Sequence, residues 1–297
     1  MNRSLSVLLL SVLLLSVLLL LSSCQRRRNH IVVASKNFTE QVVLAEILAQ
    51  HIERRLHVQV ERRFYLGGSY IAHQALIAGR VDIYPEYTGT ALTAILKLPP
   101  QHEPAAAYNA VRREYMQRFQ VEVGQPFGFN NTFAMIVRGD DARNLHITTL
   151  SQAAAAAPQW RVGVGYEFLE RPDGFNGLVA AYGLHFKDAP RVMDLGLLYR
   201  TLQEKQVDIV AGNSTDGLIA ALGCVVLQDD RNYFPPYEAV PLVRQDALAR
   251  FPGLNAALSE LAGKISDDEM RRLNYAIDGE HRDVKAVASE FLNSKGL

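Results

Sequence analysis

The sequence has 297 residues, and its 31 lysines and arginines balance its 31 aspartates and glutamates. This balance, and the absence of a basic stripe interleaved with aromatic residues, argue against a nucleic-acid partner. With two cysteines and eight histidines, the chain has no disulfide framework and no HExxH-type spacing, so we expect neither a metal site nor a cofactor.

The N-terminal stretch has the pattern of a secretory signal. One positive residue, Arg3, precedes an almost wholly apolar run that ends in small residues at Cys24. The run Leu21-Ser22-Ser23-Cys24 resembles the bacterial lipoprotein box, in which the cysteine becomes the lipidated first residue. We therefore expect a signal peptide over 1–23, a lipid anchor at Cys24, an arginine-rich tether over 24–30 near lipid headgroups, and an extracytoplasmic protein. The alternative is a plain transmembrane anchor, although the apolar run is short for the ~20 residues of a span.

The remaining sequence, of about 270 residues, is long enough for one large or two medium domains. Apolar runs and helical patterns alternate along most of it. Strands are predicted at 31–35, 58–64, 81–85, 133–138, 161–166, 207–212, 223–228 and 239–244. Helices are predicted at 39–55, 72–78, 104–119 and 196–205, and again through the C-terminal segment to 297. In that last segment Ser266 and Glu269 have the spacing of a capping box, and Cys224, in a predicted strand, is expected to be a buried thiol.

Two segments begin with the same three residues. Val81-Asp82-Ile83 leads to Tyr87 and Val207-Asp208-Ile209 leads to Asn213, with three residues between in both cases. Strands alternating with helices predict parallel sheets of βαβ units, in which ligands bind at the carboxyl ends of strands. The repetition therefore suggests two similar lobes that each offer one strand-end loop to a shared site, with Tyr87 just past its strand. Asp82 and Asp208 are expected to serve strand-end structure.

Six ordered blocks of sequence resemble one family, the substrate-binding proteins of osmoprotectant ABC importers, which take up glycine betaine, carnitine, choline and related quaternary amines. The blocks are SKNFTEQ (35–41), YPEYTGTAL (84–92), GFNNTFAMIVR (128–138), FLERPDG (168–174), STDG (214–217) and DDRNYFPPYEAVPLVR (229–244). The resemblance implies a two-lobed α/β fold of the periplasmic-binding-protein type (type II), with the ligand cleft between the lobes. It also implies that residues 31–130 and 236–297 form one lobe and 131–235 the other.

The resemblance further implies a set of ligand-binding residues. Tyr87 and Tyr237 match tyrosines of an aromatic cage for the trimethylammonium group, which cannot donate a hydrogen bond and is attracted to aromatic faces. Arg171 matches the arginine that binds the ligand carboxylate, since a guanidinium is a planar, two-pronged donor. Three further positions, in blocks that match the family, complete the polar part of the site: Lys36, Thr90 and Asn131.

Two positions depart from the family pattern. Phe133 and Asn213 stand where tyrosine is common, so the cage would have three aromatic faces, not four. Losing one face costs up to about 2 kcal/mol, or as much as thirtyfold in affinity. Either glycine betaine binds weakly, or Asn213 hydrogen-bonds a larger or more polar ligand, such as carnitine or ergothioneine. For Arg171, a surface ion pair with Asp173 or Glu170 is the alternative to a ligand contact.

Two other functions compete with solute import. An enzyme is disfavoured, because the sequence has no G-x-S-x-G elbow and no suggestive Cys–His arrangement. A sensory module that is not coupled to import stays open, because a permease-docking surface has no readable motif. The preferred interpretation is a monomeric, lipid-anchored binding protein that delivers a quaternary amine to a permease and ATPase on other chains, by hinge closure of its lobes.

Overall fold

The computed structural model describes residues 29–297, and Ile31–Leu297 forms one compact unit. The predicted signal peptide, Cys24 and most of the tether lie outside the described residues. Within the described part, none of the helices combines the length and the apolar character needed to cross a membrane.

Strands and helices alternate along the unit, as the sequence predicts. The strands are β1 (Ile31–Ala34), β2 (Val60–Arg63), β3 (Ile83–Tyr87), β4 (Val121–Val123), β5 (Phe133–Arg138), β6 (Val162–Val164), β7 (Arg191–Val192), β8 (Ile209–Asn213), β9 (Cys224–Leu227) and β10 (Ala239–Arg244). The α-helices up to β8 are α2 (Thr39–Leu56), α3 (Ser69–Ile77), α4 (Thr88–Thr90), α5 (Pro104–Phe119), α6 (Gly139–Leu145), α7 (Leu150–Ala153), α8 (Tyr166–Glu170), α9 (Phe175–Tyr182) and α10 (Leu198–Gln203). After β8 follow α11 (Leu218–Ala221), α12 (Gln245–Arg250), α13 (Leu254–Glu260), α14 (Asp267–Asp278) and α15 (Val284–Lys295).

Three differences from the predicted elements have local causes. The short strands β4 and β7 were not predicted, because three-residue and two-residue strands carry too little pattern. The helix predicted at 196–205 is a 3-10 turn, Leu195–Leu197, that continues into the shorter α10. Tyr87 is the last residue of β3 and does not lie past it.

Two five-stranded sheets organise the chain, in the orders β2-β1-β3-β10-β4 and β7-β6-β8-β5-β9. The prediction of parallel sheets is only partly right. β1 pairs in parallel with β2 and β3, and β6 with β7 and β8, but β10 runs antiparallel to β3 and β4, and β5 runs antiparallel to β8 and β9. The two reversed strands are those that follow the crossings between the sheets. Their direction depends on the end of the sheet at which the chain arrives after a crossing. The local sequence pattern carries no information about this.

The shared Val-Asp-Ile tripeptide has the same structural role in both sheets. Asp82 accepts a hydrogen bond from the backbone N–H of Val32 (2.8 Å), and Asp208 accepts one from that of Arg161 (2.8 Å). Each aspartate also donates its own N–H back to the carbonyl of the same residue. In each sheet, the carboxylate thus links the start of the central strand, β3 or β8, to the neighbouring strand, β1 or β6. The predicted role of both aspartates at strand ends is confirmed.

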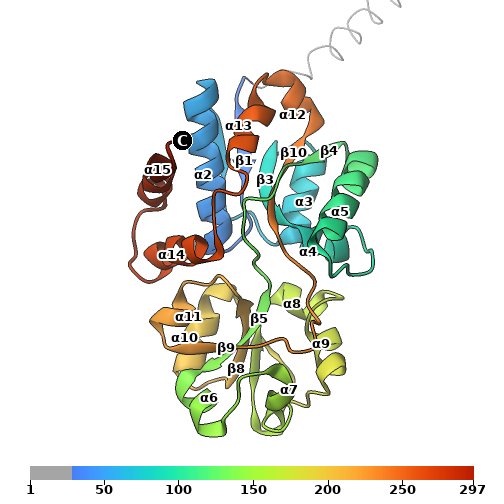
Figure 1. Ribbon diagram of the computed structural model, residues 1–297, viewed down its shortest axis with the longest axis vertical. Coiled ribbons are helices and arrows are strands. Elements are labelled where there is room, and N and C mark those ends of the chain that lie inside the picture. The colour runs from blue at the N-terminus through green and yellow to red at the C-terminus, as the bar shows by residue number, and fades with distance from the viewer. Residues whose placement is uncertain (1–28) are drawn as a thin grey trace, which may run out of the picture. The chain divides into compact units, whose positions relative to one another are not determined.

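Both faces of the first sheet are covered by helices, so β1 is apolar at every position. Ile31 and Val33 face a core built with α2, whereas Val32 and Ala34 face the core on the other side, with residues of α3 and α5. Figure 1 shows α2 and α13 on one side of this sheet and α3 and α5 on the other. The C-terminal helices α13, α14 and α15 all pack on α2, and the predicted capping box of Ser266 and Glu269 starts α14.

Two chain segments cross between the sheets side by side. Asn130, in the outgoing segment, forms an antiparallel bridge with Glu238, in the returning one. Asn131 donates its N–H to the carbonyl of Tyr237 (3.1 Å), and the N–H of Tyr237 donates to Oδ1 of Asn130 (2.6 Å). We call this paired stretch, Asn130 and Asn131 with Tyr237 and Glu238, the crossover. The proposed lobe boundary at 130/131 falls within it, and the one at 235/236 lies just before Tyr237.

Candidate functional site

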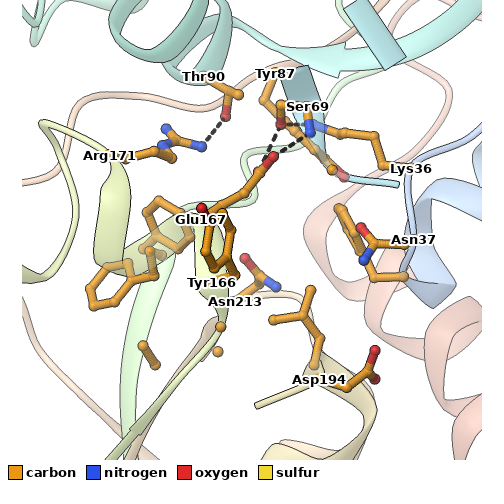
Figure 2. A pocket seen from close by; sticks show the side chains of 18 of the residues that line it. Lys36, Asn37, Ser69, Tyr87, Thr90, Tyr166, Glu167, Arg171, Asp194 and Asn213 are labelled. Carbon is orange, nitrogen blue, oxygen red and sulfur yellow. Dashed lines mark hydrogen bonds between the residues drawn. The ribbon is translucent and has the colours of Figure 1, made fainter. Parts of the chain in front are cut away.

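A cavity of about 500 Å³ opens between the two sheets and is lined from both. All eight residues predicted as ligand-binding lie in its wall: Lys36, Tyr87, Thr90, Asn131, Phe133, Arg171, Asn213 and Tyr237. They come from far-apart segments of the chain, which the fold brings together at strand ends, short helices and the crossover. Figure 2 labels many of the polar residues of the wall, among them Lys36, Arg171 and Asn213.

On one side of the cavity, a buried lysine is held by a buried carboxylate. Nζ of Lys36 lies 2.5 Å from Oε1 of Glu86 and 3.2 Å from Oγ of Ser69. The same ammonium lies over the ring of Tyr87, 4.6 Å from its centroid, and 5.8 Å from that of Phe38. The charge of Lys36 is therefore balanced within the protein, and its ammonium already occupies one aromatic face.

On the other side, an arginine and an aspartate form a buried two-pronged ion pair. Arg171 donates from Nε (2.9 Å) and Nη2 (2.6 Å) to the carboxylate of Asp173, and from Nη1 to Oγ1 of Thr90 (2.9 Å). Tyr237 and Thr93 also donate to Asp173. Burial is the largest single influence on Asp173 and favours its neutral form, but the charge of Arg171 and the hydrogen bonds from Arg171, Tyr237 and Thr93 together lower the carboxyl pKa below its ordinary value. The partner predicted as an alternative for Arg171 is thus present, although the pair is buried and not on the surface.

The predicted cage residues fall into two groups of rings. Tyr87 stacks on Phe38, with centroids 6.3 Å apart. Phe133 contacts Tyr237 (5.7 Å) in a cluster that includes Phe168 and Phe234. The guanidinium of Arg171 lies 4.7 Å from the Phe133 centroid and 5.7 Å from that of Tyr237. Each group is therefore approached by a cation of the protein itself.

Asn213 ends β8 and lines the cavity directly opposite Phe133 in the strand register. Its backbone N–H donates to Oδ2 of Asp216 (2.9 Å), which also accepts from the hydroxyl of Tyr199 (2.8 Å). Burial raises the pKa of Asp216 to about 7, with smaller contributions from the charges of Glu40 and Asp278. The turn after β8 is thereby fixed by an internal carboxyl group.

Behind the cavity, one buried glutamate is hydrogen-bonded to side chains from four different parts of the fold. Glu40, in the first turn of α2 and 2% exposed, accepts four hydrogen bonds from side chains. Its donors are Tyr87 (2.7 Å), Asn131 (2.7 Å), Thr215 (2.5 Å) and Asn274 (2.9 Å). They belong to β3, the crossover, the loop after β8 and α14. Burial raises the pKa of Glu40, although the four bonds oppose the shift.

Sequence reasoning missed several wall residues, among them Phe38, Ser69, Tyr166, Glu167 and Asp194. Phe38 stands inside the matched block SKNFTEQ and could have been noticed as an aromatic beside Lys36. Tyr166, the last residue of the strand predicted at 161–166, and Glu167 begin α8 just after β6, which is where an α/β site is expected. Ser69 and Asp194 carry no such signal. No group of metal-ligating side chains occurs among residues 29–297.

Internal pairing leaves the cavity wall acidic. Lys36 and Arg171 are each matched by a buried carboxylate, Glu86 or Asp173. The remaining charged side chains in the wall are Glu167 and Asp194, and neither has an ion-pair partner in the described part of the chain. An aromatic cavity with surplus negative charge suits a compact organic cation.

Two sheets of the same strand order, joined by a paired crossover with a ligand-sized cavity between them, define a two-lobed solute-binding protein. Residues 29–294 match the family model described as the substrate binding domain of ABC-type glycine betaine transport systems. The chain belongs to this family, and the two-lobed fold that the sequence predicted is confirmed.

Individual relatives differ in the solute that their names give. A carnitine transport binding protein of Listeria monocytogenes is 35% identical over 280 residues, which are 92% of this chain and 91% of that protein. An ergothioneine transport permease/ergothioneine binding protein of Helicobacter pylori is 34% identical over 268 residues, 90% of this chain but 48% of that longer protein. A crystal structure of a glycine betaine/carnitine/choline ABC transporter protein superposes with a TM-score of 0.75 at 34% identity, covering 90% of this chain and 98% of that one.

Proposed function

We propose that this protein captures a quaternary-ammonium solute outside the cytoplasm and delivers it to the permease of an ABC importer. The observation that carries the proposal is the cavity wall, which combines aromatic rings with an excess of carboxylates. The trimethylammonium group would meet Tyr87, Phe133 and Tyr237 on their cavity side, where each good aromatic contact contributes roughly 0.5–2 kcal/mol. Glu167 and Asp194 would add long-range attraction for the cation.

Closure of the two lobes around the solute is the proposed mechanism. Contacts across the cavity support it, because Arg171 and Asp173 of the second lobe bind Thr90 and Thr93 of the first. Relatives of the family act with a permease and an ATPase, and we assign this protein the same kind of partners. We keep the lipid anchor at Cys24 as part of the proposal; loss of incorporated lipid in Cys24→Ala, with retention in Cys224→Ser, would support it.

The test is isothermal titration calorimetry on residues 25–297, which contain the whole compact unit. Choline is compared with 3,3-dimethylbutan-1-ol, which has the same shape and no charge. We expect micromolar binding of at least one of glycine betaine, carnitine, choline, proline betaine and ergothioneine, and none of the uncharged analogue. Equal binding of choline and its analogue would remove the role of the cation, and no binding to the panel would overturn the solute class. Recovery of each ligand unchanged would argue against catalysis.

A larger solute than glycine betaine is the second candidate, because of the size of the cavity. Glycine betaine has about eight non-hydrogen atoms and fills at most ~240 Å³ at the ~30 Å³ that one water takes in the liquid. The cavity holds about 500 Å³. Carnitine or ergothioneine would occupy more of it, with Asn213 in reach of the extra polar group. A preference for either in the same titrations would support this candidate.

A further inference from the structure

Glu167 reaches across the cavity from one lobe to the other. It lies in α8, beside the second sheet, and its carboxylate contacts the first residue of α3, beside the first sheet. Ser69 donates its backbone N–H to Oε1 and its hydroxyl to Oε2 (3.0 Å). Figure 2 shows the glutamate side chain extended towards Ser69 and Lys36. Both oxygens are therefore held by the opposite lobe.

The place that receives Glu167 is suited to a carboxylate. Ser69 is 1% exposed, and its hydroxyl accepts from the ammonium of Lys36 (3.2 Å) while it donates to Glu167. The donor is thus polarised by a neighbouring positive charge. Gly68, just before, leaves the approach open: a Cβ there would lie 2.1 Å from Oε1 of Glu167. We call Lys36, Gly68 and Ser69 the carboxylate seat.

Glu167 differs from Asp173, another carboxylate that bridges the lobes. Asp173 crosses to Thr93 as half of a buried ion pair with Arg171, so its charge is neutralised within its own lobe. Glu167 has no such partner in the described part of the chain, where its carboxylate is held by the hydrogen bonds from Ser69. Because it lines the cavity, a solute carboxylate could reach the same donors.

We propose that Glu167 is an internal substitute for the carboxylate of a zwitterionic solute: it occupies the seat when the cavity is empty and yields it when such a solute binds. The displacement rests on the proposed function, whereas the role of Glu167 in holding the empty lobes together does not. A zwitterion has to compete with Glu167. Choline, which has no carboxylate, leaves Glu167 in place and gains from its negative charge.

The two solutes therefore respond in opposite directions to Glu167→Gln, which keeps the shape and removes the charge. In calorimetry on residues 25–297 we expect the Kd of glycine betaine to fall about three- to tenfold and that of choline to rise by a similar factor, since ~1 kcal/mol separates charged from neutral hydrogen bonds. Glu170→Gln, at the exposed end of the same helix, is the matched control and should change neither value. If both solutes shift in the same direction, or neither shifts, the substitution role is wrong.

Ser69→Ala tests the seat from the other lobe. Made on the Glu167→Gln background, where no side-chain carboxylate occupies the seat, it removes a donor to the solute carboxylate, so glycine betaine should bind several-fold more weakly while choline changes little. A loss of equal size for both solutes would mean that Ser69 only supports the fold. Thermal melting of each variant, followed by circular dichroism, identifies any that fails to fold.

A measurement without ligand separates failure of this inference from failure of the proposed function. Spin labels at Gln117→Cys and Asn144→Cys, exposed positions beside the first and second sheets, are introduced in a Cys224→Ser background. Pulsed electron–electron double resonance then measures the distribution of distances between the two labels, and so between the lobes. Glu167→Gln should broaden this distribution or shift it to longer distances, and Glu170→Gln should not. Identical distributions would overturn the inference even if the solutes of the panel bind.

Discussion

Tyr87 and Asn213 end the third strands of two sheets built on the same order, and they line one cavity from opposite lobes. Each follows the isoleucine of a Val-Asp-Ile tripeptide by four residues. The two positions are structural equivalents, but one carries an aromatic ring and the other an amide. This asymmetry is the feature of the wall on which the choice of solute is expected to depend.

Asn213→Tyr should therefore restore an aromatic face. The new ring would stand opposite Phe133 in the strand register and face the cavity. We expect glycine betaine to bind up to about thirtyfold more tightly, which corresponds to about 2 kcal/mol. Calorimetry with glycine betaine measures the change, and the uncharged choline analogue serves as control. Unchanged affinity for glycine betaine would mean that the aromatic-cage argument fails.

Glu40→Gln should destabilise the junction behind the cavity. The amide of glutamine would turn one of the two acceptor oxygens into a donor that faces two other donors, either those of Tyr87 and Asn131 or those of Thr215 and Asn274. We expect the free energy of unfolding to fall by about 1–3 kcal/mol, the cost of an unsatisfied buried group. Urea unfolding measures it, with exposed Glu170→Gln as the same substitution elsewhere. A loss no larger than that of the control would contradict the role of Glu40.

Asp173→Asn should be costly, because it leaves the buried guanidinium of Arg171 without its counter-charge. Removing one partner of a buried pair typically destabilises by about 3–5 kcal/mol, whereas an exposed pair contributes about 0–1 kcal/mol. Glu204→Gln, which breaks the exposed pair with Arg200, is the matched comparison. Chemical unfolding of both variants tests the difference; similar small losses would show that Arg171 finds another partner or solvent.

Asp216 should contribute stability that increases on mild acidification, whereas buried His73, whose pKa is lowered to about 4, contributes a change of the opposite sign. The pKa of Asp216 is about 7 in the folded state against an ordinary value of 3.8. Between these values the folded state binds more protons than the unfolded chain, so the free energy of unfolding decreases as pH rises through this window. Burial also raises the pKa of Glu40 and of Asp278, which adds a change of the same sign.

Asp216→Asn imitates the protonated form and should remove part of this pH dependence, on the order of 2 kcal/mol between pH 4.5 and 7.5. Urea unfolding at the two pH values measures it. Asp188→Asn, at an exposed position, is the control and should keep the dependence of the original protein. An unchanged slope in Asp216→Asn would show that this carboxyl group is ionised in the folded state throughout the range.

Much of the fold follows from local sequence. Long amphipathic segments such as α2 and α5, and apolar runs such as β1 and β10, have patterns set by their own burial. The capping box at Ser266 likewise depends only on residues three positions apart. The reversed directions of β5 and β10 depend on where the chain arrives from, so no local pattern encodes them.

The cavity was predictable in part for a similar reason. Seven of the eight proposed residues lie in blocks that resemble a known family, Asn213 directly precedes one of these blocks, and all eight line the cavity. Apart from the Arg171–Asp173 pair, what each contacts was not predictable: the ion pair of Lys36 with Glu86 and the bridge from Glu167 to Ser69 join segments 50 and 98 residues apart. Such contacts arise only from tertiary packing. Their roles towards a solute stay predictions for the experiments above.

The crossover carries a further consequence, because Asn131 and Tyr237 belong both to the connection between the lobes and to the cavity wall. If the lobes close as proposed, a solute that contacts the Tyr237 ring also contacts the segment that connects the lobes. The angle between the closed lobes would then depend on the size of the solute, because a bulkier molecule would stop the closure earlier. A permease that contacts both lobes at once would then respond to the size of the bound solute without contacting the solute.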